Sequence, residues 1–193
     1  MAYVLLIKAV RELSADIDMH DEWGLTAGED GQIKELPLTY SPDGKPYFES
    51  IPVHFNISHA GDRVMVALSP GEVGCDVEHK SKDALRIAKR FFTVREYEAL
   101  LAIADEERRS QEFMRLWTLK ESVVKCCGEG IRHSFDDFSL LDAEGERKSI
   151  IKLNSRNVPY HIKEFKSENG YCYSCCSAYG EFEEELRKIY EPD

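Results

Sequence analysis

Two carboxylates separated by one residue, Asp76 and Glu78, lie in the apolar run 72–78. The small and β-branched residues of this run predict a strand, and alternate residues of a strand point to the same face. Two anions on one half-buried face repel each other, and a divalent cation between them relieves that repulsion. Because oxygen ligands suit Mg²⁺, the pair is a candidate magnesium site. The alternative is that both side chains face solvent.

A second candidate group lies on residues 109–127, where the spacing of apolar residues predicts a helix that stops at Gly128. Trp117, Glu121 and Lys125 follow one another at intervals of four and form one stripe along this helix. A core tryptophan beside a surface ion pair would also produce the stripe. Since the helix is otherwise apolar, we expect its carboxylate and lysines to face something polar, such as a cation held by the first pair.

Two shorter motifs add hydrogen-bond donors. The strand predicted over 53–58 ends in Ser58 and His59 before a turn at Gly61, where a hydroxyl and an imidazole can meet a phosphate. Upstream, Lys45 lies in a Gly-Lys-Pro turn. Taken alone, a structural histidine and an ordinary loop lysine explain these motifs equally well.

The surrounding elements are predicted to be strands, then helices, then strands, an order typical of an α+β fold rather than a doubly wound one. Strands are predicted at residues 1–10, 53–58, 63–68, 72–78, 138–141, 149–153, 160–165 and 171–178. The three strands within 53–78 are expected to be sequential antiparallel neighbours. Helices are predicted weakly near 14–23, over 85–92, after a capping box at 93–96, and over 109–127.

The composition limits the class of protein. The chain has 193 residues, 42% of them hydrophobic, which is enough to bury a core without disulfides or metals. The net charge of −11 argues against a duplex nucleic-acid partner, because such proteins neutralise phosphates with basic residues. The apolar N-terminus is too short to span a membrane and lacks the charged flank of a signal peptide. We therefore expect no nucleic acid and no membrane as partners.

Six cysteines occur in the chain. Without a secretory signal they are predicted to be reduced thiols of a cytoplasmic protein. Cys172, Cys175 and Cys176 raise the possibility of a zinc site, but strand geometry sends the first two to opposite faces. Small buried hydrophobic residues are the favoured interpretation.

In this order, the motifs resemble the 4′-phosphopantetheinyl transferase superfamily, specifically its surfactin-synthetase-activating type. The resemblance covers about residues 43–142, and its most specific part is the acid pair combined with Trp-x-x-Lys-Glu-Ser-x-x-Lys. The matching stretches are 44–46, 55–59, 74–78, 88–92, 96–97 and 117–122, together with Lys125.

The resemblance implies a Mg²⁺-dependent holo-carrier-protein synthase. Such an enzyme moves 4′-phosphopantetheine from coenzyme A to a serine of an apo acyl or peptidyl carrier protein and releases 3′,5′-ADP. The implied Mg²⁺ ligands are Asp76, Glu78 and Glu121. The implied coenzyme A-binding residues are Lys45, Ser58, His59, Lys120 and Lys125. The implied catalytic residues are Asp76, Glu121 and Lys125, with Glu121 taking the serine proton directly, through a water, or with help from Lys125.

The family architecture is two pseudo-symmetric α+β lobes with the site at their junction. Here it implies a shortened N-terminal lobe over 1–73 and a C-terminal lobe over 74–193, forming a monomer. The first 40 residues are acidic where relatives carry a basic helix that grips the 3′-phosphate of coenzyme A. Lys45 and His59 are therefore expected to hold that phosphate alone. The resemblance leaves open whether the carrier serves fatty-acid, polyketide or nonribosomal-peptide synthesis.

Two other functions remain possible. A non-catalytic homologue that binds carrier protein or coenzyme A would keep the fold but lose an essential ligand, whereas this chain retains all three acids and both lysines. A Mg²⁺-dependent phosphohydrolase could use the same carboxylates with water as nucleophile. A basic run over 80–95 is either a solvated helix face or a docking site for an acidic carrier.

Overall fold

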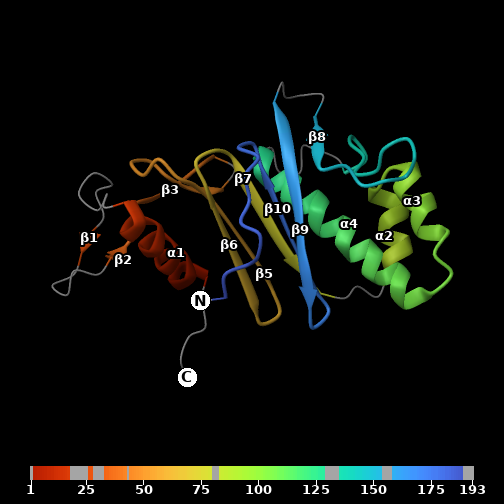
Figure 1. The fold of residues 1–193 in the computed structure, drawn as a ribbon, viewed down its shortest axis with the longest axis horizontal. Helices are drawn as coiled ribbons and strands as arrows, with labels where there is room; N and C mark the ends of the chain where they lie inside the picture. The colour runs from red at the N-terminus through yellow and green to blue at the C-terminus, as the bar shows by residue number, and fades with distance from the viewer. Residues whose placement is uncertain are drawn as a thin grey trace.

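The computed structural model describes residues 2–17, 26–27, 33–42, 44–79, 83–128, 135–153 and 158–188 (Figure 1). The helices are α1 (Ala2–Ile17), α2 (Ala84–Phe91), α3 (Val94–Leu101) and α4 (Glu106–Cys127). The strands are β1 (Thr26–Ala27), β2 (Ile33–Glu35), β3 (Leu38–Tyr40), β4 (Pro46–Phe48), β5 (His54–Ala60), β6 (Arg63–Ser69), β7 (Val73–Glu78), β8 (Ile150–Lys152), β9 (Pro159–Glu168) and β10 (Tyr171–Ser177). The predicted α+β class is confirmed.

The N-terminus departs most from the sequence predictions. Residues 1–10 were predicted to be a strand, but residues 2–10 lie in helix α1, so that prediction is wrong. Leu6, Ile7 and Val10 are buried, and this spacing puts them on one face of a helix, against β6. A short run of consecutive apolar residues fits a buried strand and a buried helix equally well. Of the helix predicted at 14–23, residues 14–17 belong to α1 and the rest lie outside the described residues.

Two antiparallel sheets build the centre of the molecule. Strands β5 and β6 form a hairpin, while β7 is the edge of a four-stranded sheet in the order β7-β10-β9-β8. The strand predictions for these segments are confirmed, but β7 pairs with β10 rather than continuing the hairpin. A side chain joins the two sheets instead, because the backbone N–H of Cys75 donates a 2.9 Å hydrogen bond to Asn56 Oδ1. The strand predicted at 138–141 is wrong, since only Leu141 makes a single bridge there, with Arg147.

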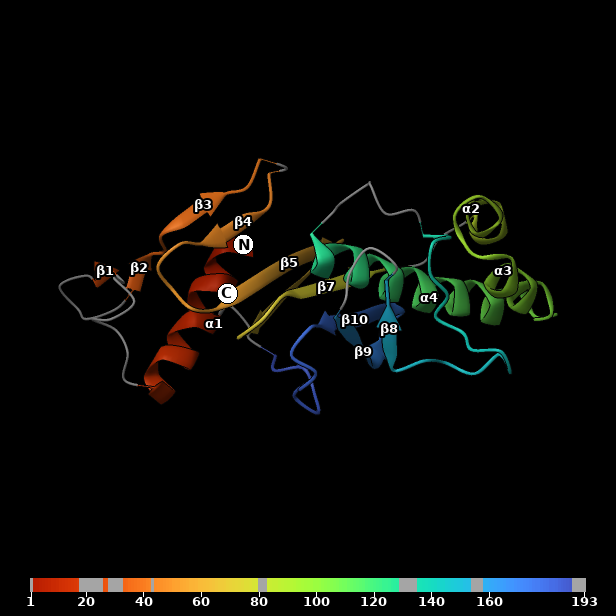
Figure 2. The same ribbon diagram turned by 90° about the horizontal axis from the view of Figure 1, so that it is seen from above.

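Helix α4 packs across β7 and β10, and the smaller helices α2 and α3 pack at its N-terminal end (Figure 2). It begins earlier than predicted, because the Asp105 side chain caps it by accepting from the N–H of Arg108. It ends at Gly128, whose φ of 70° closes the last turn as predicted. The predicted capping box of α3 is also confirmed, with Thr93 and Glu96 exchanging side-chain and backbone hydrogen bonds.

All six cysteines are buried thiols outside any disulfide, as predicted. Cys172 and Cys176 pack with the helices, whereas Cys75 and Cys175 pack with β6, on the other side of the sheet. The strand thus uses its thiols as small apolar groups on both faces. Among the described helices, none is long and apolar enough to cross a membrane. The short pairs β1–β2 and β3–β4 were not predicted.

Gly74 sets the distance between β7 and α4. A methyl group at this position would overlap the carbonyl oxygen of Ser122 and the backbone nitrogen and Cα of Cys126. These are backbone atoms of α4, so no side-chain rotation can make room. Glycine at this position therefore lets the helix approach the strand closely.

We expect Gly74→Ala to lower the free energy of unfolding by about 3 kcal/mol, because the helix must move away from the strand. Urea denaturation measures the loss. Gly71→Ala is the matched control, since a methyl group there meets only ordinary contacts with Tyr179 at 3.9 Å. Equal stability of the two variants would contradict the close-packing role of Gly74.

Candidate functional site

The candidate site is centred on Asp76, a carboxylate on β7 that is only 2% exposed. Its Oδ1 accepts hydrogen bonds from the Ser58 hydroxyl at 2.8 Å and from Lys125 Nζ at 2.5 Å. Lys125 also donates to Ser58 Oγ at 3.1 Å. Strand β5, strand β7 and the last turn of α4 each contribute one member. The site is thus assembled where the hairpin, the sheet and the helix meet.

Glu78 and Glu121 extend this group into a set of three carboxylates. Burial raises the pKa of Glu78 to about 7, and the charges of Asp76 and Glu121 add to the increase. A hydrogen bond from the Trp117 side chain acts in the opposite direction. Burial, followed by the charge of Asp76, also raises the pKa of Glu121. Each carboxylate is therefore costly to ionise, and Lys125 lowers this cost for all three by its positive charge.

The donor chemistry of this set fits a hard divalent cation. Three carboxylates supply only oxygen, the ligand type that Mg²⁺ prefers. Among the described residues, Asp76 Oδ2 is buried and has no hydrogen-bond partner. A buried carboxylate oxygen usually binds a protein donor, a water or an ion, so this oxygen is a candidate position for a cation. Within those same residues, no three acidic, histidine or cysteine side chains are already arranged to hold a metal ion. The carboxylates would have to draw together around a cation.

The predicted coenzyme A-binding residues fall into two groups. Ser58 and Lys125 lie on Asp76, and Lys45 is close to them, because its Nζ donates a 2.7 Å hydrogen bond to the carbonyl oxygen of Lys125. His59 is exposed on β5 beside Ser58. A pocket of about 270 Å³ opens next to Lys45, with Phe48 and other apolar residues in its lining.

Lys120 lies elsewhere, in the interior of the protein. Its side chain is 0% exposed, and its Nζ is 3.0 Å from Glu96 Oε2. It also donates hydrogen bonds to the carbonyl oxygens of Phe135 at 2.5 Å and Phe138 at 2.7 Å. Three acceptors thus use the three protons of the ammonium group. The structure brings Asp76, Ser58 and Lys125 together and keeps Lys120 apart from them.

Residues 72–176 match the family model of the 4′-phosphopantetheinyl transferase superfamily. The chain is 36% identical over 162 residues to the 4′-phosphopantetheinyl transferase Sfp of Bacillus subtilis (strain 168), a match that covers 82% of this chain and 71% of the relative. The chain belongs to the 4′-phosphopantetheinyl transferase superfamily. It is also 34% identical over 164 residues to the transferase ffp of Bacillus subtilis, covering 83% of this chain and 72% of the relative. These matches confirm the resemblance to the Sfp type.

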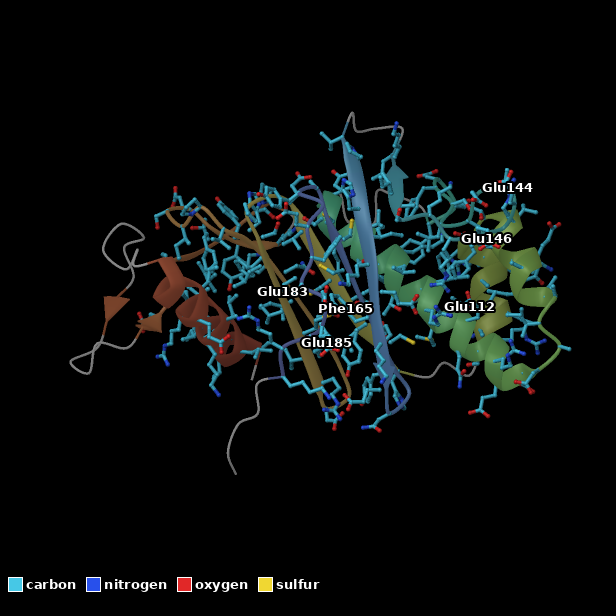
Figure 3. The ribbon with its side chains drawn as sticks, viewed as in Figure 1. Glu112, Glu144, Glu146, Phe165, Glu183 and Glu185 are labelled. Carbon is cyan, nitrogen blue, oxygen red and sulfur yellow. The ribbon has the colours of Figure 1, made fainter. Side chains whose placement is uncertain are left out.

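In this transferase, Glu112 lies on α4, toward the N-terminal end of the helix, where α2 and α3 pack (Figure 3). Glu112 pairs with Arg115 at 2.9 Å and with Arg147 at 2.5 Å, and both arginines also pair with Glu164 on β9. The four charges form a closed ring that joins α4, β9 and the segment before β8. Ion pairing accounts for these acids, so they are separate from the candidate site.

Sequence reasoning missed two polar residues that position the site of the transferase. Asn56 joins β5 to β7, and Glu96 anchors Lys120 while it also accepts from the backbone N–H of Leu140 at 2.8 Å. Asn56 lies between the apolar residues Phe55 and Ile57, and a polar side chain in such a position is a signal for a hydrogen bond within the structure. From the sequence, Glu96 is the acid of a capping box and part of the family-matching stretch 96–97. Its second role depends on residues that are distant in the sequence, so no local pattern indicates it.

We expect Lys120→Met to lower the free energy of unfolding by about 3–5 kcal/mol, because it leaves the buried carboxylate of Glu96 without its counter-ion. The double variant Lys120→Met/Glu96→Gln should recover part of this loss. Thermal and urea unfolding measure both. Arg86→Met is the control, since it breaks the exposed pair with Asp83 and should cost less than about 1 kcal/mol. A loss as small for Lys120→Met as for the control would rule out this structural role.

Proposed function

We propose that this transferase is a holo-carrier-protein synthase, which moves 4′-phosphopantetheine from coenzyme A to a serine of an apo acyl or peptidyl carrier protein. The observation that carries the proposal is the group formed by Asp76, Lys125 and Ser58, flanked by Glu78 and Glu121. It places acids, a cation and a hydroxyl together at the meeting of β5, β7 and α4. Family membership supports the same activity.

The transfer needs charge stabilisation and removal of one proton. The serine oxygen attacks the phosphorus that carries the pantetheine arm, a new O–P bond forms, and the P–O bond to 3′,5′-ADP breaks. Lys125 supplies positive charge where negative charge builds up on the phosphate oxygens. The serine proton has to pass to a base, and we assign this to Glu121, acting directly, through a water, or with help from the neighbouring Lys125.

We propose that Mg²⁺ is the cofactor and that Asp76, Glu78 and Glu121 hold it. The unpartnered Oδ2 of Asp76 and the all-oxygen donor set support this assignment. When bound, the cation would neutralise charge on the pyrophosphate. Asp76 would then be the ligand closest to Lys125, whose Nζ contacts its other oxygen, Oδ1, in the structure.

We propose that coenzyme A binds along the side of the site that runs from Lys125 past Lys45 to the neighbouring pocket. Ser58 and His59 line the adjacent strand β5. Lys120 is left out of this set, because its ammonium is fully used inside the protein. Its role in the family motif is then to hold the helix that carries Glu121 and Lys125.

The division into lobes at 1–73 and 74–193 remains part of the proposal. The hairpin β5–β6 and helix α1 precede the boundary, which falls after the first residue of β7, while α4 and the rest of the four-stranded sheet follow it. Asp76 lies just beyond the boundary and Ser58 before it, so the pair would join the two lobes. We also retain a monomer acting in the cytoplasm as a prediction from the sequence.

We expect Asp76→Ala and Glu121→Gln each to reduce transfer about a hundredfold or more, since each removes a charge that the reaction uses. Mass spectrometry of apo carrier protein incubated with coenzyme A and Mg²⁺ counts the modified molecules, and EDTA should stop modification by the unaltered protein. Glu112→Gln, on the same helix but in the ion-pair ring, is the matched control and should stay active. Normal transfer by either site variant would falsify the assignment. Hydrolysis of coenzyme A to 4′-phosphopantetheine and 3′,5′-ADP without a carrier would favour the phosphohydrolase alternative.

A basic surface on α2 is the proposed docking site for the carrier. Lys89 and Arg90 are exposed in the last turn of this helix, and the apolar side chains of Phe91 and Val94 are exposed beside them. Cations around apolar side chains match a partner that has acids around an apolar contact. Lys80 and Lys82 of the same basic run lie outside the described residues.

We expect Lys89→Glu/Arg90→Glu to lower kcat/KM for the carrier about tenfold at low salt, because charge attraction speeds association. The difference should shrink as salt is added, and the KM for coenzyme A should stay the same. Steady-state rates at several ionic strengths measure this. The control is Arg187→Glu/Lys188→Glu, an adjacent basic pair in the C-terminal segment. Docking on α2 is excluded if both double variants behave alike.

A further inference from the structure

The Lys125 ammonium lies on one oxygen of Asp76, the carboxylate proposed as a cation ligand. Its Nζ lies 2.5 Å from Oδ1, and the carboxylate is 2% exposed. A buried carboxylate requires a counter-charge, because moving an ion out of water costs several kcal/mol. Lys125 supplies that charge in the metal-free protein. The other oxygen, Oδ2, is left without a partner among the described residues.

We propose that Lys125 is a built-in counter-ion that competes with the divalent cation for Asp76 and leaves the carboxylate when the cation binds. The inference rests on the proposed function, because it requires the cation site of Asp76, Glu78 and Glu121. It adds a determinant of cation affinity that is not itself a ligand. A divalent cation on Oδ2 and the ammonium on Oδ1 would repel each other across this buried carboxylate, and that repulsion favours release of the ammonium.

The geometry of Lys125 allows it to move. The residue lies in the last turn of α4, and its side chain is 30% exposed, in contrast to the fully buried side chain of Lys120. Its backbone carbonyl oxygen is held by Lys45, so the flexible four-carbon side chain can swing while the main chain stays fixed. Ser58 can keep its hydrogen bond to Asp76 in both states.

The inference also explains why the three carboxylates are not already arranged around a common point. Within the described ranges, no ready metal-binding group is present. Because Lys125 contacts Asp76, its positive charge is in direct contact with only one of the three carboxylates. Without the ammonium, the repulsion among the three carboxylates increases, and an incoming divalent cation would relieve it. The released ammonium then lies beside the same site, free to bind phosphate oxygens.

The test is a binding measurement on the purified protein with neither coenzyme A nor carrier. Mn²⁺ is the probe, because carboxylate sites for Mg²⁺ also accept it, and its free concentration is read by electron paramagnetic resonance. We expect Lys125→Met to bind Mn²⁺ about tenfold more tightly than the unaltered protein, as expected from the coupling of close charge pairs. Lys125→Arg keeps the competing charge and should not bind more tightly.

Two controls separate direct competition from a general change of charge. Lys45→Met removes a neighbouring cation that does not touch Asp76, and Lys188→Met removes a cation from the exposed pair with Glu168. Each should change Mn²⁺ affinity less than about twofold. Unchanged or weaker binding by Lys125→Met overturns the inference, and so does an equal gain in Lys45→Met.

A second measurement covers the case in which Lys125→Met fails to fold. In the unaltered protein, NMR signals of the Lys125 ammonium should show slow proton exchange with water, and added Mg²⁺ should speed that exchange. No change on saturation with Mg²⁺ overturns the inference.

The variant Asp76→Asn separates failure of the counter-ion inference from failure of the proposed cation site. If Mn²⁺ binding depends on Asp76 but not on Lys125, the counter-ion inference alone fails, whereas no binding to the unaltered protein removes the cation site itself.

Discussion

The close contact of helix α4 with strand β7 is the constraint on which the rest of the structure depends. At Gly74 the strand backbone meets the helix backbone at Ser122 and Cys126, with no side chain between them. Asp76 follows two residues along the strand, and Glu121 and Lys125 flank the same contact on the helix. A wider spacing would separate the carboxylate from the ammonium that neutralises it. A single residue without a side chain therefore fixes the distance across which the charges of the site interact.

Two buried ion pairs then hold α4 from different sides. Lys125 reaches Asp76 at the candidate site, while Lys120 reaches Glu96 inside the protein. The two lysines are five positions apart on the helix, so they leave it in different directions. The inner pair has every proton satisfied and is fully buried, whereas the outer pair is partly exposed and has an unpartnered oxygen beside it. The Lys120–Glu96 pair therefore suits a fixed structural support, whereas the Lys125–Asp76 pair suits a site where the carboxylate exchanges one cation for another.

The sequence was sufficient for the features that depend on local spacing. The capping box at Thr93, the end of α4 at Gly128 and the hairpin turn at Gly61 depend on neighbouring residues, and the structure has all three. Where the packing or pairing partner of a segment lies far away in the sequence, local spacing did not predict the structure. The apolar run at Leu6 fits either a strand or a helix until the surface it packs on is known, and β7 pairs with a strand about a hundred residues further on.

The same limit applies to the candidate site. Its acids could be found from sequence because alternation on a strand and intervals of four on a helix are local rules. Lys120 and Lys125 both belong to the same short motif, yet one faces the core and the other faces Asp76. Lys120 is the lysine that faces the core because Glu96 and the carbonyl oxygens of the segment after α4 bind its ammonium. These partners have no fixed spacing from the motif.

The local charge balance explains how a chain with a net charge of −11 can bind a pyrophosphate. With all three carboxylates ionised, Asp76, Glu78 and Glu121 together with Lys45 and Lys125 give the candidate site one excess negative charge. In the proposed site, a bound divalent cation would reverse this to one excess positive charge, which suits a doubly charged pyrophosphate. The proposed cation would therefore change the local field from one that repels a pyrophosphate to one that attracts it, whatever the charge of the rest of the surface.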